Sequence, residues 1–115
     1  MSVKTYDKIP EYIESLCNIF QSINKKANAM EDKRCKMIAL MLYNYINKLA
    51  KDNNVDFKTI KETEFINLIP VFEYISHNNI ELYDFKKIEI TDVDTTKNSD
   101  LERFILTHVY YITQN

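Results

Sequence analysis

KMIALMLYNYINKLAK, residues 36–51, is the most apolar stretch of the chain, and it decides the fold that we expect. Seven apolar residues run unbroken from Met37 to Tyr43. Two helical turns without a polar position have no side suited to water, and a helix that is apolar all round is a buried one. Asn44 and Asn47 interrupt the run before the ~20 residues needed to cross a bilayer. The stretch therefore predicts the central buried helix, residues 29–50, of a small soluble domain.

The size and composition of the chain favour one small helical domain. Its 115 residues fit a single domain, residues 1–115, with 1–8 as a loose tail. The sequence has no glycine, although average usage is ~7%. Without glycine the chain cannot form a P-loop or a dinucleotide-binding fingerprint, and asparagine must supply left-handed residues. We therefore expect a mainly α fold, a small four-helix bundle.

Apolar spacing and capping patterns predict the remaining helices. A stripe at intervals of three and four residues predicts a helix over about 9–26. Asn28 with Glu31, and Ser99 with Glu102, have the form of capping boxes that start the second and last helices, the last one covering about 100–113.

Pro70 either kinks a helix or lies in the first turn of one that begins near Asn67. Asp56 is expected to cap a short turn around Phe57 and Ile60, ahead of the apolar series that starts at Phe65.

Residues 80–91, IELYDFKKIEIT, show partial alternation, which is typical of a strand or of an extended segment lying over the core. A lone strand needs a partner. Residues 83–91 could therefore add to the sheet edge of another protein, with their apolar side chains as the binding residues. These are Tyr83, Phe85, Ile88 and Ile90.

Charge and cysteine content limit the partners and the cellular compartment that we expect. The net charge is −2 with acids and bases interspersed, so no basic field for duplex DNA is expected. No helix combines a basic face with a continuous apolar one, which argues against membrane binding. The N-terminal residues lack the apolar core of a signal peptide, so a cytoplasmic location is expected. Cys17 and Cys35 are then reduced, buried thiols, and the alternative is a disulfide that joins the first two helices.

Metal and cofactor chemistry has weak support in the sequence. A calcium loop would have ligands at the positions of Asp92, Asp94, Thr96 and Asp100. However, Lys97 and Arg103 occupy its glycine and bidentate glutamate positions. The two histidines and two cysteines lack zinc-ligand spacing. We expect no metal and no cofactor.

RFILTHVYY, residues 103–111, contains Arg103, His108 and Tyr110 in the pattern RxxxxHxY. This pattern resembles the signature of HEPN-domain ribonucleases and toxins over residues 103–110. The resemblance implies an all-helical dimer in which Arg103 binds phosphate and His108 transfers protons during RNA cleavage, with Tyr110 completing the catalytic set. The alternative is a histidine at the core or its edge, with Arg103 paired to Asp100 or Glu102.

Two functions follow from these patterns. The first is a small non-enzymatic helical protein that binds and modulates another protein, as phage, viral, immunity and antitoxin proteins do; eight tyrosines support it, because tyrosine is common at interfaces. The alternative is a HEPN-like, metal-independent endoribonuclease that acts as a toxin or defence effector. We prefer the first, with another protein as partner. A homodimer and an RNA substrate belong to the second.

Overall fold

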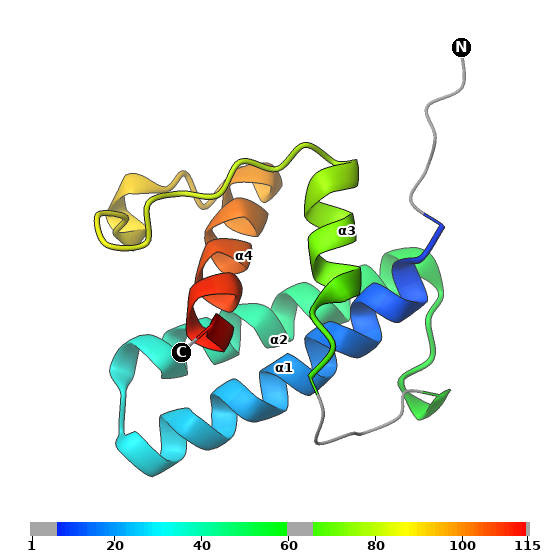
Figure 1. Ribbon diagram of the computed structural model, residues 1–115, viewed down its shortest axis with the longest axis horizontal. Helices are drawn as coiled ribbons and strands as arrows, with labels where there is room; N and C mark the ends of the chain where they lie inside the picture. Colours follow the sequence, from blue (N-terminus) through cyan, green and yellow to red (C-terminus); the bar gives the residue numbers. More distant parts are fainter. Residues whose placement is uncertain (1–6, 60–65, 115) are drawn as a thin grey trace.

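The fold consists of helices joined by irregular segments (Figure 1). The computed structural model describes residues 7–59 and 66–114. In these ranges there are four α-helices, two short 3₁₀ turns and no strand. The α-helices are α1 (Ile9–Met30), α2 (Lys33–Asn53), α3 (Ile69–His77) and α4 (Asn98–Gln114), and the 3₁₀ turns are Phe57–Thr59 and Ile90–Asp92. The prediction of a small, mainly α domain is confirmed.

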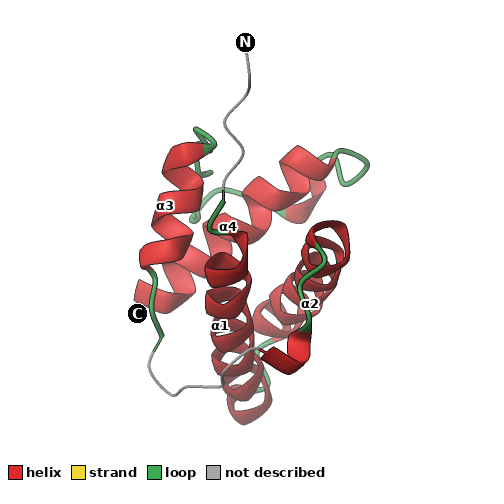
Figure 2. Ribbon diagram, turned by 90° about the vertical axis from the view of Figure 1, so that its right-hand side faces the viewer, coloured by secondary structure: helices red, strands yellow, loops and turns green. Residues whose placement is uncertain are grey.

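The central helix is α1 and not the predicted α2. α1 contacts α2, α3 and α4, and lies side by side with α2 while α3 and α4 cross the pair (Figures 1 and 2). α1 has more buried residues than any other described helix. They are the apolar Tyr12, Ile13, Leu16, Ile19, Ile23 and Ala27, together with Ser15 and Asn18. The helix predicted over about 9–26 is therefore confirmed as α1, and it lies in the middle of the bundle.

α2 is helical as predicted, but it is not buried all round. Leu40 is 63% exposed and Tyr43 is 53% exposed, whereas Ile38 and Leu42 are fully buried. The prediction failed because an unbroken apolar run does not say how many neighbours surround a helix. In this fold α1 and α4 cover one side of α2, and the other side faces outward.

Burial all round occurs instead in α4. Six consecutive residues, from Phe104 to Val109, are all buried. α1 and α2 cover one side of this helix. The loop between α3 and α4 also contributes buried side chains, Ile88 and Val93, and lies beside α4 in Figure 1. The string that resembles the ribonuclease signature is thus the most enclosed helical segment described.

The break between α1 and α2 differs from the predicted capping box at Asn28 and Glu31. α1 continues to Met30, and Glu31 takes a left-handed conformation with φ 51°. Asp32 is the N-cap of α2, since its carboxylate accepts hydrogen bonds from the backbone N–H groups of Arg34 (2.9 Å) and Cys35 (3.3 Å). Asparagine supplies two other left-handed residues, Asn54 and Asn79, as expected for a chain without glycine.

Pro70 lies in the first turn of α3, so the helix starts at the proline and is not kinked by it. The Asn67 side chain accepts from the Ile69 N–H at 3.1 Å, just ahead of this start. Asp56 caps the turn at Phe57–Thr59 as predicted, because its carboxylate accepts from the Lys58 N–H at 2.9 Å. The predictions for Ile60, Phe65 and most of the 1–8 tail lie outside the described residues.

Both cysteines are free thiols, so the disulfide alternative is not formed. Cys35 is buried, whereas Cys17 is partly exposed. Burial, with the nearby Glu14 charge, raises the pKa of Cys17 to about 11. At neutral pH this thiol is therefore protonated and a weak nucleophile. No helix in the described ranges has both the length and the apolar character to cross a membrane.

Candidate functional site

Residues 80–93, here named the covering segment, form no strand. The strand alternative for residues 83–91 is wrong, because turns at Asp84–Ile88 and Glu89–Val93 interrupt the extended backbone. The other alternative, a segment lying over the core, agrees with the structure, since Ile88 belongs to the core and Tyr83 and Ile90 pack against it. The Tyr83 N–H donates to the Thr107 hydroxyl of α4 at 3.0 Å. Several of the segment's backbone groups are thus hydrogen-bonded within its own turns and to α4.

The four side chains predicted for strand addition lie against the rest of the domain. Phe85 stacks on Tyr111 of α4, with ring centres 5.0 Å apart and planes inclined by 15°. Ile88 is buried, and Ile90 is half-buried against the core. Tyr83 is half-buried under Arg103. These four side chains therefore pack within the domain, and strand addition through residues 83–91 stays a prediction.

The only two arginines of the sequence, Arg34 and Arg103, both hold the covering segment. Arg34 donates from Nη2 to the Ile88 carbonyl at 3.2 Å, and its guanidinium lies 4.8 Å from the centre of the Phe85 ring. Arg103 donates from Nε to the Glu81 carbonyl and lies 3.8 Å from the centre of the Tyr83 ring. Each arginine therefore combines a hydrogen bond with a cation–π contact.

His108 is fully buried and hydrogen-bonded through both ring nitrogens. Nδ1 lies 3.0 Å from the Phe104 carbonyl, and Nε2 lies 3.0 Å from Nε of Arg34. An arginine N–H can only donate, so Nε2 is the acceptor and Nδ1 carries the proton. Burial is the main cause that lowers the pKa of His108, and the Arg34 charge adds to it. The imidazole is therefore neutral at pH 7.

The residues of the RxxxxHxY pattern have separate surroundings. His108 contacts Arg34, Arg103 contacts residues 81–83, and the Tyr110 ring packs 5.7 Å from that of Phe72. Within the chain, His108 is enclosed in the core, and Arg103 pairs with neither Asp100 nor Glu102. The ribonuclease interpretation stays a prediction, in which a second copy of the chain would have to complete the site.

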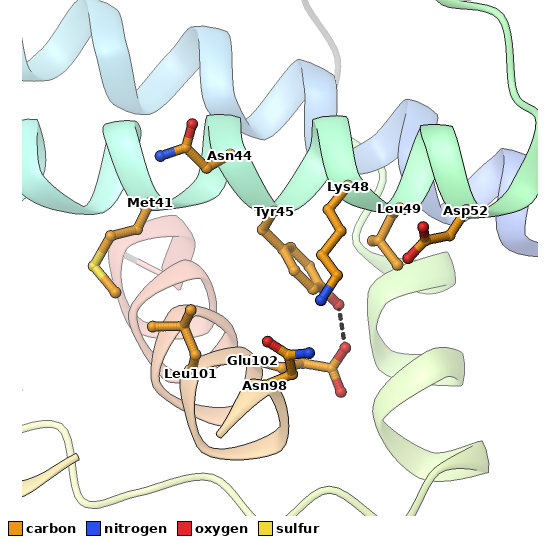
Figure 3. Close-up of a pocket in the computed structure, with 9 residues that line it drawn as sticks. All are labelled: Met41, Asn44, Tyr45, Lys48, Leu49, Asp52, Asn98, Leu101 and Glu102. Carbon is orange, nitrogen blue, oxygen red and sulfur yellow. Dashed lines mark hydrogen bonds between the residues drawn. The ribbon is translucent and has the colours of Figure 1, made fainter. Parts of the chain in front are cut away.

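A pocket of about 360 Å³ lies between α2 and α4 (Figure 3). Volumes of this size are in the range of small-molecule sites, ~300–1,000 Å³. Both apolar and polar side chains line it. The lining residues are Met41, Asn44, Tyr45, Lys48, Leu49, Asp52, Asn98, Leu101 and Glu102.

Among the charged residues that line this pocket, Glu102 is held in place by two hydrogen bonds. Its Oε2 accepts from the hydroxyl of Tyr45 at 2.6 Å and from the hydroxyl of Tyr74 at 3.0 Å. The Tyr45 hydroxyl also lies 2.8 Å from that of Tyr12, whose ring stacks on Tyr74 at 4.0 Å. Burial, with the neighbouring Tyr12 and Glu102 oxygens, raises the pKa of Tyr45 well above its usual value. Tyr45 therefore remains a protonated donor to the carboxylate.

Sequence reasoning missed this pocket because it assigned Glu102 to a local capping box. α4 begins at Asn98, so Ser99 lies inside the helix and Glu102 reaches across to α2 and α3. The positions of three tyrosines contained a signal from which a buried polar site could be predicted. A buried tyrosine hydroxyl requires a hydrogen-bond partner, and Tyr12, Tyr45 and Tyr74 fall on the apolar stripes of three helices.

Two of the three aspartates in the acidic loop at 92–100 accept hydrogen bonds from the backbone. Asp92 accepts from the Glu89 N–H at 3.1 Å, and Asp94 accepts from the Thr96 N–H at 3.0 Å. Across residues 7–59 and 66–114, no three histidine, cysteine, aspartate or glutamate side chains are placed to share a metal ion.

The outward side of α2, here named the outer face, is both apolar and basic. The exposed residues from position 33 to position 51 fall within one arc of the helix, at ~100° per residue. They are Lys33, Lys36, Leu40, Tyr43, Asn44, Lys48 and Lys51. Asp52 and Asn53, at the end of the helix, are also exposed. Phe20 of α1 extends the apolar part, since its ring lies 5.6 Å from that of Tyr43. No acidic residue occurs between Lys33 and Lys51.

Comparison of the chain with protein-family models, with curated proteins and with solved structures gave no match.

Proposed function

We propose that the protein is a non-enzymatic helical module that binds another protein through the outer face of α2. The observation that carries this proposal is the exposure of Leu40 and Tyr43 beside Phe20. Large exposed apolar side chains are common singly, but adjacent ones on one helix face are typical of interaction sites. An aromatic and an aliphatic residue at the centre of such a face can act as binding anchors.

The charge around these anchors defines the chemistry of the partner. Four lysines surround Leu40 and Tyr43 on the outer face, while the whole chain has a net charge of −2. A basic rim around an apolar centre is complementary to a partner with acidic side chains around an apolar patch. The partner proposed here is such an acidic protein surface.

The first prediction is that Leu40→Asp with Tyr43→Asp abolishes partner binding and leaves the fold intact. Both side chains are more than half exposed, so their loss costs little stability, while two charges enter the centre of the interface. We expect at least a 100-fold loss of affinity, measured by calorimetry against the partner isolated with the wild-type protein. Circular dichroism checks the helices.

The matched control is Asn24→Asp with Asn28→Asp, two exposed positions of α1 that add the same charge elsewhere. This variant should bind like the wild type.

Because the rim is basic, affinity should also fall as salt is raised from 50 to 500 mM. Unchanged affinity of the Leu40/Tyr43 variant would overturn the proposed surface.

The endoribonuclease alternative predicts a different set of outcomes. Purified protein should then dimerise and cleave RNA, and both Arg103→Ala and His108→Ala should abolish cleavage while the outer-face variant retains it. RNA that remains intact with folded wild-type protein would count against this function. Cleavage by the wild type that is lost in folded Arg103→Ala would replace the binding proposal.

A further inference from the structure

We propose that the pocket between α2 and α4 binds a primary alkylammonium group, with the carboxylate of Glu102 as its counter-ion. This site is separate from the apolar centre of the outer face, and the inference does not depend on the proposed function. The ligand chemistry is that of a lysine side chain or of a free alkyl amine.

The first observation is the difference in hydrogen bonding between the two oxygens of the Glu102 carboxylate. Oε2 of Glu102 accepts from Tyr45 and Tyr74, which sets the position of the carboxylate. Oε1 receives no hydrogen bond from any residue in the described ranges. Figure 3 shows the Glu102 side chain directed toward Tyr45, among the residues that line the pocket. A carboxylate held in place with a free oxygen is prepared to bind a cation without reorganisation.

The second observation is that only one oxygen of the Glu102 carboxylate, Oε1, has no hydrogen-bond donor in the described ranges. A guanidinium binds a carboxylate best through two parallel hydrogen bonds, which need both oxygens. Here Oε2 already has two donors, so a paired geometry is disfavoured. An ammonium is a compact charge and can bind to Oε1 alone. The geometry therefore favours an ammonium over a guanidinium.

The third observation is the apolar wall. Met41, Leu49 and Leu101 line the pocket beside Glu102. An alkyl chain of four or five carbons can pack on these side chains while its terminal ammonium reaches the carboxylate. The volume of about 360 Å³ accommodates such a chain.

The protein's own Lys48 lines the same pocket but does not occupy this role. Within the described part of the chain, Lys8 and Glu73 form the one ion pair closer than 4.0 Å. Lys48 is exposed and repels a bound cation. Removing its charge therefore distinguishes a cationic ligand from an anionic one by the sign of the effect.

The test is an NMR titration of the wild-type protein with n-butylammonium chloride, with n-butanol as the neutral probe of the same shape. We expect shifts of amide signals around Tyr45 and Leu101, and a dissociation constant of roughly millimolar order for so small a probe. Glu102→Gln should weaken binding at least tenfold. Lys48→Met should strengthen it two- to fivefold, and Glu11→Gln, an exposed position of α1, should change nothing.

Each outcome bears on the proposal. If Glu102→Gln fails to fold, Lys48→Met still gives the sign of the ligand charge. Equal shifts with n-butanol, shifts away from the pocket, or weaker binding by Lys48→Met would overturn the proposal.

A second titration with Nα-acetyl-lysine methylamide identifies the source of the ammonium group. Tighter binding than n-butylammonium indicates the lysine of a polypeptide, and weaker binding indicates a free amine. Because Leu40 and Tyr43 are unchanged here, failure of this site leaves the proposed function standing.

Discussion

His108→Ala is expected to lower the free energy of unfolding by about 3 kcal/mol, the sum of a core cavity and an unsatisfied buried donor. The imidazole is fully buried, and its removal leaves Nε of Arg34 without its acceptor. For a domain of this size the loss corresponds to a melting temperature lower by on the order of 10 to 15 °C. Urea unfolding followed by circular dichroism measures it.

The control is the chain's other histidine, His77, which is exposed on α3. His77→Ala should cost under about 0.5 kcal/mol. Equal effects of the two substitutions would show that the enclosure of His108 contributes nothing to stability. The comparison also bears on the ribonuclease alternative, since a loss of cleavage by an unfolded His108→Ala variant has no catalytic meaning.

The same histidine predicts how stability depends on pH. The pKa of His108 is lowered in the fold from its usual 6.5, mainly by burial and further by Arg34, against the raising effects of the Phe104 carbonyl and Glu89. Below pH 6.5 the unfolded chain therefore binds a proton that the folded chain does not. Stability is complete above pH 6.5 and falls as the pH is lowered from there.

His108→Ala should flatten this dependence between pH 7 and pH 5. The carboxyl groups with a lowered pKa, Asp32 and Asp94, lie below 3.8 in the fold and act outside this window. Unfolding curves at several pH values measure the slope. A variant that loses as much stability as the wild type between pH 7 and pH 5 would contradict the assignment.

The helices were predictable because each follows from local chemistry. The spacing of apolar residues in α1, Pro70 in the first turn of α3 and Asp56 at its turn act within a few positions of the chain. Burial around α2 and α4 was not predictable in this way. Leu40 and Ile38 are both apolar, and only the position of α2 in the bundle decides which of them faces water.

The surroundings of His108 and of Glu102 depend on hydrogen bonds between residues that are far apart in the sequence. Arg34 and His108 are separated by 74 positions, and Tyr45 and Glu102 by 57. No periodicity or spacing rule connects such residues. Glu102 also had a satisfactory local interpretation, because it completed a capping box with Ser99. The tertiary partner prevails because a buried tyrosine hydroxyl has few other acceptors, whereas the start of a helix can be satisfied by water.

Arg34→Ala is expected to release the covering segment and to lower stability by about 2 to 3 kcal/mol. The substitution leaves the Ile88 carbonyl and Nε2 of His108 without their donor, and it removes the cation from the Phe85 ring. Hydrogen exchange should accelerate at the amides of Lys87 and Ile88, which bond to the Asp84 carbonyl. Mass spectrometry of deuterated peptides measures this.

The titration of His108 gives a second and independent readout of the same substitution. The Arg34 charge lowers the pKa of His108, so its removal should raise that pKa toward 6.5, and an opened covering segment should raise it further by admitting water. NMR titration of the imidazole follows the change. Arg103→Ala is the matched control, since it removes the other arginine that holds the segment, at Glu81 and Tyr83. It should accelerate exchange near residue 83 and leave the pKa of His108 unchanged. If both variants raise that pKa equally, the enclosure of His108 depends on the segment as a whole and not on Arg34.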